Sequence, residues 1–249
     1  MAKNNATYQI KEKIIRKIGM ANNAYNLIEK DDRILVALSG GVDSFVLLHT
    51  IHSRLKFLPI RYTIEAIHVQ NTHIPDKTNT ELLHNFCDTL KVPLHFEKTS
   101  IQPREGKQKN MCFPCSWNRR KKIFQKAQES GFNKVAMGHH MDDALETLLM
   151  NMVNHGEFSA IPPKLFMKKG QIEIIRPLIL VNEQDIKTYA RHFHIQNAEY
   201  ECPYENENKR AKFKEIVQEM SQLNDQGKIN LFNSMTNLFP EYLPPRKPK

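Results

Sequence analysis

The run Ser39-Gly40-Gly41-Val42-Asp43-Ser44 combines residue types that can together hold a metal-bound phosphate. Adjacent glycines let the backbone approach an anion closely, the hydroxyls of Ser39 and Ser44 can donate to phosphate oxygens, and Asp43 is suited to bind Mg²⁺. The run predicts a nucleotide site, with an ordinary glycine turn as the alternative. A Walker-A pattern is absent there, which disfavours transfer of a γ-phosphate.

A second polar run is Gly138-His139-His140-Met141-Asp142-Asp143-Ala144-Leu145-Glu146-Thr147. Asp142 and Asp143 fall in the predicted first turn of a helix, where the helix dipole favours carboxylates. They can also coordinate a cation beside a polyphosphate. Helix capping alone could explain the acids, and His139 could equally be a buried structural histidine.

Three cysteines form the third group. Cys112 and Cys115 have CxxC spacing, which is compatible with half a zinc site, a redox pair or two unconnected thiols, and Cys202 could supply a third thiolate. Cys87 lies in an apolar periodic stretch and is predicted to be buried core. Since a second CxxC or HxxxH pair is absent, three thiolates better suit a [4Fe-4S] cluster with one iron open to another ligand.

Positive charge is concentrated near the cysteine pair. The formal net charge is +9, and residues 104–126 contain eight basic side chains against the single acid Glu105. Clustered Lys and Arg gain binding free energy by releasing counterions from phosphates, so RNA is a plausible partner, and a solvated helix face is the alternative. The residues predicted to contact RNA are Arg119, Arg120, Lys121, Lys122 and Arg176.

Composition places the chain among ordinary globular proteins, with 249 residues, 40% hydrophobic and 25% charged. Its longest apolar runs are of strand length, and its first residues lack the layout of a secretory signal. We therefore expect no membrane association and a cytoplasmic location.

The elements that position these residues alternate between strands and helices. Strands are predicted at 34–38, 62–69, 93–98, 134–137 and 172–175, and helices at 8–29, from 45, 78–91, 116–130, 141–154, 182–193 and 206–222. This alternation predicts an α/β fold with an open, mainly parallel five-stranded sheet covered by helices on both faces. Ligands of such sheets bind at the carboxyl ends of the strands, where both polar runs are expected.

The order of motifs resembles the PP-loop ATP-pyrophosphatase superfamily. SGGxDS is the signature of that superfamily, and GHHxDDxxET resembles a second motif of its RNA-modifying branch. From about residue 30 to 220 the chain is similar to the tRNA 2-thiocytidine synthetase group, with CxxCSxxRR, PPK, IRPL and a late single cysteine also in order. It departs from that group at Val42, where Lys is common, and after the late cysteine, where Pro203-Tyr204 follows.

The resemblance implies a PP-loop, Rossmann-like fold with an N-terminal basic helical segment (1–30), an ATP-pyrophosphatase domain with a CxxC insertion (31–200) and a C-terminal helical segment with a tail (201–249). It implies that Cys112, Cys115 and Cys202 hold a [4Fe-4S] cluster. It also implies that Mg-ATP adenylates the 2-carbonyl of a tRNA cytidine before sulfur replaces the oxygen. On this resemblance Asp43, Asp142 and Asp143 are expected to be catalytic, and Gly138 and His139 are expected to belong to the nucleotide site.

The partners implied are tRNA and a persulfide sulfur donor such as a cysteine desulfurase, and a homodimer is one assembly left open. Alternatives within the superfamily are thiolation of uridine and formation of lysidine. The extra CxxC pairs of uridine-thiolating relatives with zinc modules are absent, and lysidine formation uses no cluster. A non-catalytic RNA-binding protein with a structural metal would not need both polar runs.

Overall fold

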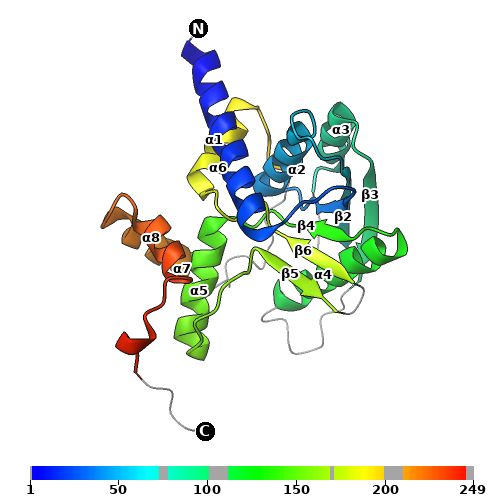
Figure 1. The fold of residues 1–249 in the computed structure, drawn as a ribbon. Coiled ribbons are helices and arrows are strands. Elements are labelled where there is room, and N and C mark those ends of the chain that lie inside the picture. The colour runs from blue at the N-terminus through cyan, green and yellow to red at the C-terminus, as the bar shows by residue number, and fades with distance from the viewer. Residues whose placement is uncertain (1, 73–77, 101–111, 169–170, 199–209, 245–249) are drawn as a thin grey trace. The chain divides into compact units, whose positions relative to one another are not determined.

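The structure is a computed structural model that describes residues 2–72, 78–100, 112–168, 171–198 and 210–244 (Figure 1). Its strands are β1 (Arg33–Ala37), β2 (Thr63–Asn71), β3 (Leu94–Thr99), β4 (Lys134–Ala136), β5 (Lys164–Met167) and β6 (Ile172–Ile175). Its helices are α1 (Ala2–Tyr25), α2 (Val42–Arg54), α3 (Thr80–Leu90), α4 (Cys112–Glu129), α5 (Met141–His155), α6 (Glu183–His192), α7 (Arg210–Gln222), α8 (Gly227–Ser234) and the short 3₁₀ helix η2 (Pro240–Tyr242).

Within the described ranges, six strands form one sheet in the order β3-β2-β1-β4-β6-β5. All neighbouring pairs are parallel except β5 with β6, which is antiparallel. The chain passes from β1 to β2 and β3 on one side of β1 and then crosses from β3 to β4 on the other side, so a topological switch point lies between β1 and β4. The predicted α/β fold with a mainly parallel sheet is therefore confirmed, with one strand more than expected.

Both faces of the sheet are covered because its strands are apolar on both sides. Leu35, Ile67 and Val135 pack with Ile123 and Ala127 of α4 on one face. Side chains alternate along a strand, so the fully buried Ile34 and Val36 point to the opposite face, where α2 packs against β1. Helix α6 packs on α2 and on α1.

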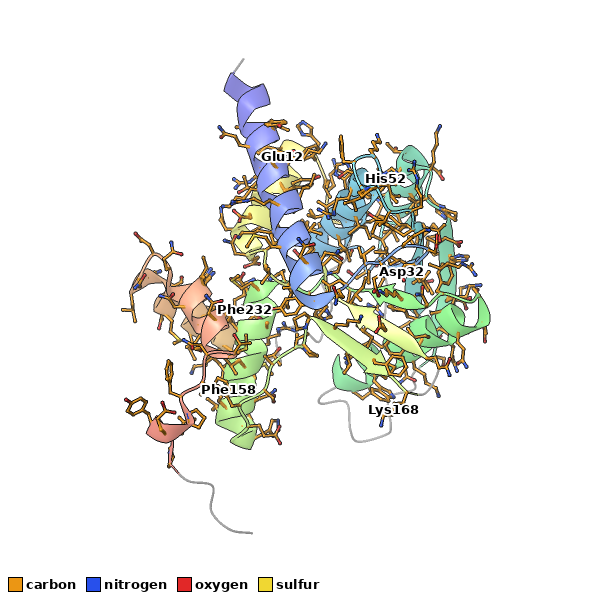
Figure 2. All side chains as sticks on the ribbon, viewed as in Figure 1. Glu12, Asp32, His52, Phe158, Lys168 and Phe232 are labelled. Atoms are coloured by element: carbon orange, nitrogen blue, oxygen red, sulfur yellow. The ribbon has the colours of Figure 1, made fainter. Side chains whose placement is uncertain are left out.

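A buried charge network fixes the amino end of β1 and β4. The Nζ of Lys134, whose side chain is 2% exposed, lies 2.8 Å from Asp32 and 3.0 Å from Glu29. Asp32, labelled in Figure 2, also accepts a 2.7 Å hydrogen bond from the Asn133 amide. Burial alone would lower the pKa of Lys134, but the hydrogen bonds to Asp32 and Glu29 raise it above its ordinary value.

Contacts between residues divide the chain into two units, 1–141 with 162–208 and 142–161 with 209–249. The second unit contains nearly all of α5 together with α7 and α8. Its buried apolar side chains include Leu145 and Leu148 of α5, Phe213 and Val217 of α7, and Phe232 of α8, which is labelled in Figure 2. In the ranges that the structure describes, none of the helices is long and apolar enough to cross a membrane.

Candidate active site

The glycine-rich run connects β1 to α2 at the carboxyl end of the sheet. Leu38 extends the pairing of β1, since its amide donates to the Ile67 carbonyl at 2.9 Å. Gly40 follows with a φ of +103°, a backbone conformation that residues with a side chain rarely adopt. Gly41 is the N-cap of α2, so the loop ends at the N-terminus of that helix. The free backbone amides of a helix N-terminus favour the binding of an anion.

The two serines of this loop brace its backbone. Ser39 Oγ accepts from the Gly41 amide at 3.1 Å, and Ser44 Oγ donates to the Gly41 carbonyl at 2.7 Å. The two hydroxyl oxygens lie 3.4 Å apart. Behind them, Phe45 and the residues that follow are buried, which anchors α2 against the sheet. The predicted nucleotide loop is thus built as a preorganised turn on a rigid helix.

The second polar run (138–147) follows β4, and its first residue, Gly138, packs closely against this loop. A Cβ added to Gly138 would lie 3.2 Å from both the Asp43 carbonyl carbon and the Ser44 nitrogen. Only glycine allows so close an approach between two backbones. His140, which is 5% exposed, places Nε2 3.7 Å from a carboxylate oxygen of Asp43. The half-exposed Asp43 carboxylate is therefore held at the loop and remains accessible to a cation.

Two residues of β2 that were not predicted as functional also lie at this edge. His68 is 1% exposed, and its Nδ1 lies 2.9 Å from the Leu38 carbonyl, just before the loop. Asn71, the last residue of β2 and equally buried, donates from Nδ2 to the sulfur of Cys115 at 3.6 Å. The sequence gives little signal for them, because β2 also contains the polar residues Thr63, Glu65 and Gln70.

The structure describes one of the three predicted cluster cysteines with its side chain. Cys115 lies in the first turn of α4, is partly buried, and has its thiol beside Asn71. The backbone of Cys112 begins α4, whereas its side chain and the whole of Cys202 lie outside the described residues. Among the residues described, no group of three or more His, Cys, Asp or Glu could hold a metal ion.

Cys87 is fully buried, as predicted, and burial raises the pKa of its thiol to about 12. A thiol so hard to deprotonate is a poor metal ligand, because the thiolate is the ligand. Cys115 is therefore the described cysteine best suited to a metal centre.

In the second unit, the acids of α5 are paired with cations of α7 and α8. Asp142 lies 2.5 Å from Lys228 Nζ, and Arg210 bridges Asp143 at 2.5 Å and Glu146 at 2.7 Å. Burial raises the pKa of Glu146 although Arg210 opposes that shift. The catalytic roles given to Asp142 and Asp143 stay predictions.

The residues predicted to contact RNA differ in their surroundings. Arg120 and Lys121 are exposed on α4, and Arg120 donates to the Ser116 carbonyl and hydroxyl of its own helix. Lys122 forms a 3.2 Å ion pair with Glu97 of β3. Arg119 is partly buried.

Arg176 is 6% exposed, and its guanidinium donates to the Pro162 carbonyl at 2.6 Å. That bond ties the end of β6 to the segment entering β5. An RNA contact by Arg176 stays a prediction.

A family model described as PP-loop domain matches residues 10–220 of this chain. A tRNA-cytidine(32) 2-sulfurtransferase from Geotalea uraniireducens (strain Rf4) is 32% identical over 95% of this chain and 96% of its own length. The protein of the same name from Burkholderia multivorans (strain ATCC 17616 / 249) is 34% identical over 93% of this chain and 71% of its own.

Among solved structures, the U34-tRNA thiolase NcsA from Methanococcus maripaludis with its [4Fe-4S] cluster superimposes with a TM-score of 0.77. It is 19% identical, and the match covers 95% of this chain and 82% of that one. An NAD⁺ synthetase from Burkholderia pseudomallei matches with a TM-score of 0.51 and 12% identity, over 96% and 91% of the two chains. At such identities these two likenesses show a shared fold.

Proposed function

Because the chain belongs to the PP-loop family and matches one sulfurtransferase relative over 96% of that relative's length, we propose that it is an ATP-dependent tRNA sulfurtransferase. Its substrate in this proposal is cytidine 32 of tRNA, the base that the relatives' names specify, and its product is 2-thiocytidine. The observation that carries the proposal is that the loop Ser39–Ser44 follows β1, while the sulfur of Cys115 lies beside Asn71 at the carboxyl end of the adjacent strand β2. Sulfur chemistry and nucleotide chemistry can therefore act on the same base.

The loop would bind the polyphosphate of ATP through its backbone amides and its two serine hydroxyls. The 2-carbonyl oxygen of the cytidine attacks the α-phosphorus, the bond to the β-phosphate oxygen breaks, and pyrophosphate leaves. The loop contributes by stabilising the charge that develops on that leaving group. Asp43, held near His140 and 45% exposed, is the carboxylate that would hold Mg²⁺ on the polyphosphate.

Adenylation makes the base carbon electrophilic, because AMP is a better leaving group than oxide or hydroxide. A sulfur nucleophile then attacks C2, the C2–O bond breaks, and AMP departs. A persulfide donor such as a cysteine desulfurase, together with a thiol reductant, supplies this sulfur. Since its substrate in this proposal is tRNA, we expect the enzyme in the cytoplasm. The assembly to test first is a homodimer.

Cys112, Cys115 and Cys202 would be the ligands of a [4Fe-4S] cluster, which when bound supplies an iron position that can carry sulfur. The surroundings of Cys115 fit this role. Its sulfur is partly shielded from solvent and already accepts a hydrogen bond from the buried Asn71 amide. Hydrogen bonds to ligand sulfurs orient them and tune the cluster, so Asn71 would hold Cys115 in place.

The test is anaerobic reconstitution with iron and sulfide, followed by absorption and Mössbauer spectroscopy of wild type and of Cys112→Ala, Cys115→Ala and Cys202→Ala. We expect a [4Fe-4S] signal in wild type and its loss in all three variants. Cys87→Ala is the matched control and should keep the cluster, since that thiol is buried core. Absence of a cluster from wild type, or its retention in all three variants, would refute the sulfur-transfer chemistry.

The base is identified separately, by mass spectrometry of tRNA nucleosides from cells with and without the gene. The proposal expects 2-thiocytidine to disappear when the gene is deleted. Loss of a thiouridine with 2-thiocytidine unchanged would assign the enzyme to the other base.

A further inference from the structure

A groove of about 650 Å³ opens beside the nucleotide loop, between that loop and helix α6. Val42, the fourth residue of the glycine-rich run, lines it from one side. The other side is formed by α6 and the residues that follow it, through Gln184, Lys187, Arg191, His194 and Gln196. All of these residues belong to the first unit.

The wall of this groove is tied to the loop through the backbone. The Ala198 amide donates to the Gly40 carbonyl at 2.9 Å, and the Asn79 amide donates to the Ala198 carbonyl at 2.9 Å. The segment that leaves α6 therefore runs against the nucleotide loop. A ligand in the groove would lie next to whatever the loop binds.

Helix α6 presents its polar side to the groove. Ile186 and Tyr189 are fully buried, whereas Lys187 and Arg191, one helical turn apart, are exposed. The buried Asp185 is directed to the other side, where Lys13 and Lys17 of α1 neutralise it at 2.7 and 3.2 Å. The groove side of the helix is thus its cationic side.

The charges on that side are only partly offset. Lys187 has an i,i+4 ion pair with Glu183 at 2.9 Å, and such an exposed pair is weak. Arg191 donates to the Thr188 hydroxyl at 3.2 Å and to the Lys187 carbonyl at 3.4 Å, and both acceptors are neutral. Among the residues that the structure describes, Arg191 forms no ion pair with a carboxylate. An anion in the groove would meet both positive charges.

We propose that this groove binds backbone phosphates of the tRNA beside the base that reacts. The inference rests on the proposed function and adds the surface that holds the RNA. Long exposed cations with neighbouring amide side chains suit sequence-independent contacts to a phosphodiester chain. The polyphosphate of ATP offers the same chemistry, but the amides and hydroxyls of the loop already provide for it.

This surface is separate from the basic stretch of α4. Helix α4 covers the sheet face that contains Leu35, whereas α6 packs on α2, which covers the opposite face. RNA held by α6 reaches the reacting centre from the loop side. The α4 stretch, by contrast, continues directly from the cysteine pair.

The experiment measures the affinity of the full-length protein for unmodified tRNA by fluorescence anisotropy over a range of salt concentrations. Lys187→Gln combined with Arg191→Gln removes two phosphate contacts, so we expect affinity to fall about tenfold or more. The slope of log affinity against log salt should become shallower by roughly 1.5 to 2. Both side chains are exposed, and a thermal melt checks that the variant folds as wild type does.

The matched control is Lys30→Gln combined with Arg61→Gln, which removes the same charge at the amino end of β1 and β2, away from the loop. It should leave both affinity and salt slope near the wild-type values. A rescue variant adds Val42→Lys to the double α6 variant, which returns one positive charge to the groove. It should recover about half of the lost salt slope.

The outcomes separate this inference from the proposed function. If wild type binds tRNA and the α6 variant keeps its affinity and salt slope, the groove does not hold RNA. If the α6 variant binds tRNA normally but its KM for ATP rises, the groove serves the nucleotide and the inference is overturned. If wild type itself neither binds tRNA nor releases pyrophosphate from ATP, the proposed function fails first.

Discussion

Gly138→Ala adds one methyl group where the second polar run meets the nucleotide loop. The new Cβ would lie 3.2 Å from the Asp43 carbonyl carbon and the Ser44 nitrogen, and 3.3 Å from the Asp43 oxygen. Ordinary contacts are near 3.5 to 4.0 Å, so one backbone must move by a few tenths of an ångström. All three contacted atoms belong to the loop backbone, which cannot yield as a flexible side chain would.

Overpacking of this kind costs roughly 1 to 3 kcal/mol of stability. If about 1.4 kcal/mol of that strain displaces the loop backbone from the geometry that, in the proposed function, stabilises the leaving pyrophosphate, the rate falls about tenfold. We therefore expect Gly138→Ala to lower the melting temperature and to reduce pyrophosphate release tenfold or more. Coupled detection of pyrophosphate at saturating ATP and calorimetry measure the two effects.

Gly19→Ala is the control, because it makes the same substitution inside α1. There the nearest atom is Arg54 Nη1 at 3.4 Å, an ordinary contact with a side chain. Alanine favours a helix over glycine by roughly 0.5 to 1 kcal/mol, so this variant should be as stable as wild type or slightly more stable, with unchanged activity. If the two variants behave alike, the close approach of Gly138 to the loop is not functional.

Three further outcomes are expected. Lys134→Met should lower the free energy of unfolding in urea by about 3 to 5 kcal/mol, because it leaves the buried Asp32 carboxylate without its cation. Burial lowers the pKa of His49 to about 4, so between about pH 6.5 and 4 only the unfolded chain binds this proton. The free energy of unfolding should therefore fall across that range, by on the order of 3 kcal/mol for this group. Arg210→Met should speed tryptic cleavage within α7, because Glu146 loses its partner.

Each of these has a variant that isolates its cause. Lys121→Met removes an exposed lysine of α4 and should change the free energy of unfolding by less than about 0.5 kcal/mol. His49→Gln should flatten the pH dependence, and equal slopes for it and wild type would assign the loss to other groups. Glu219→Gln, at an exposed site on α7 that trypsin does not cut, should leave the rate of cleavage unchanged and so serves as the reference for Arg210→Met.

The pH effect on His49 also has contributions from its surroundings. Besides burial, the positive charges of Lys11, His52 and Lys56 lower the pKa of His49. The ring is held by the Tyr189 hydroxyl, 3.0 Å from its Nδ1. Moderate salt should therefore reduce the pH dependence only slightly, because exposed charges are screened but burial is not.

Periodicity in the sequence predicted five of the six strands in the described ranges, because each has apolar side chains at strand spacing. It missed β5 (Lys164–Met167), an edge strand of mixed polarity whose pairing comes from β6 rather than from its own pattern. It also missed α8 (Gly227–Ser234), which is short and has one buried side chain, Phe232. Elements that are stabilised mainly by contacts with a neighbouring element have only a weak periodic pattern in their own sequence.

The site was predictable where chemistry is local and unpredictable where it depends on packing. The loop Ser39–Ser44 is contiguous, so its turn and its helix could be inferred from residue order. The contact of Asn71 with Cys115 joins the end of one strand to the first turn of a distant helix. The pairing of Arg210 with Glu146 likewise depends on which helices meet in the fold. Neither pair has a spacing rule that sequence alone could supply.

The hydrogen bond between Ala198 and Gly40 also has a consequence for synthesis on the ribosome. Gly40 is made early, but the backbone partner that closes the wall beside it is translated only after the rest of the sheet. At a translation rate of about 5 to 20 residues per second, Ala198 is made roughly 10 to 30 seconds after Gly40. We therefore expect the nucleotide loop of a nascent chain to lack this backbone partner until most of the chain has been made.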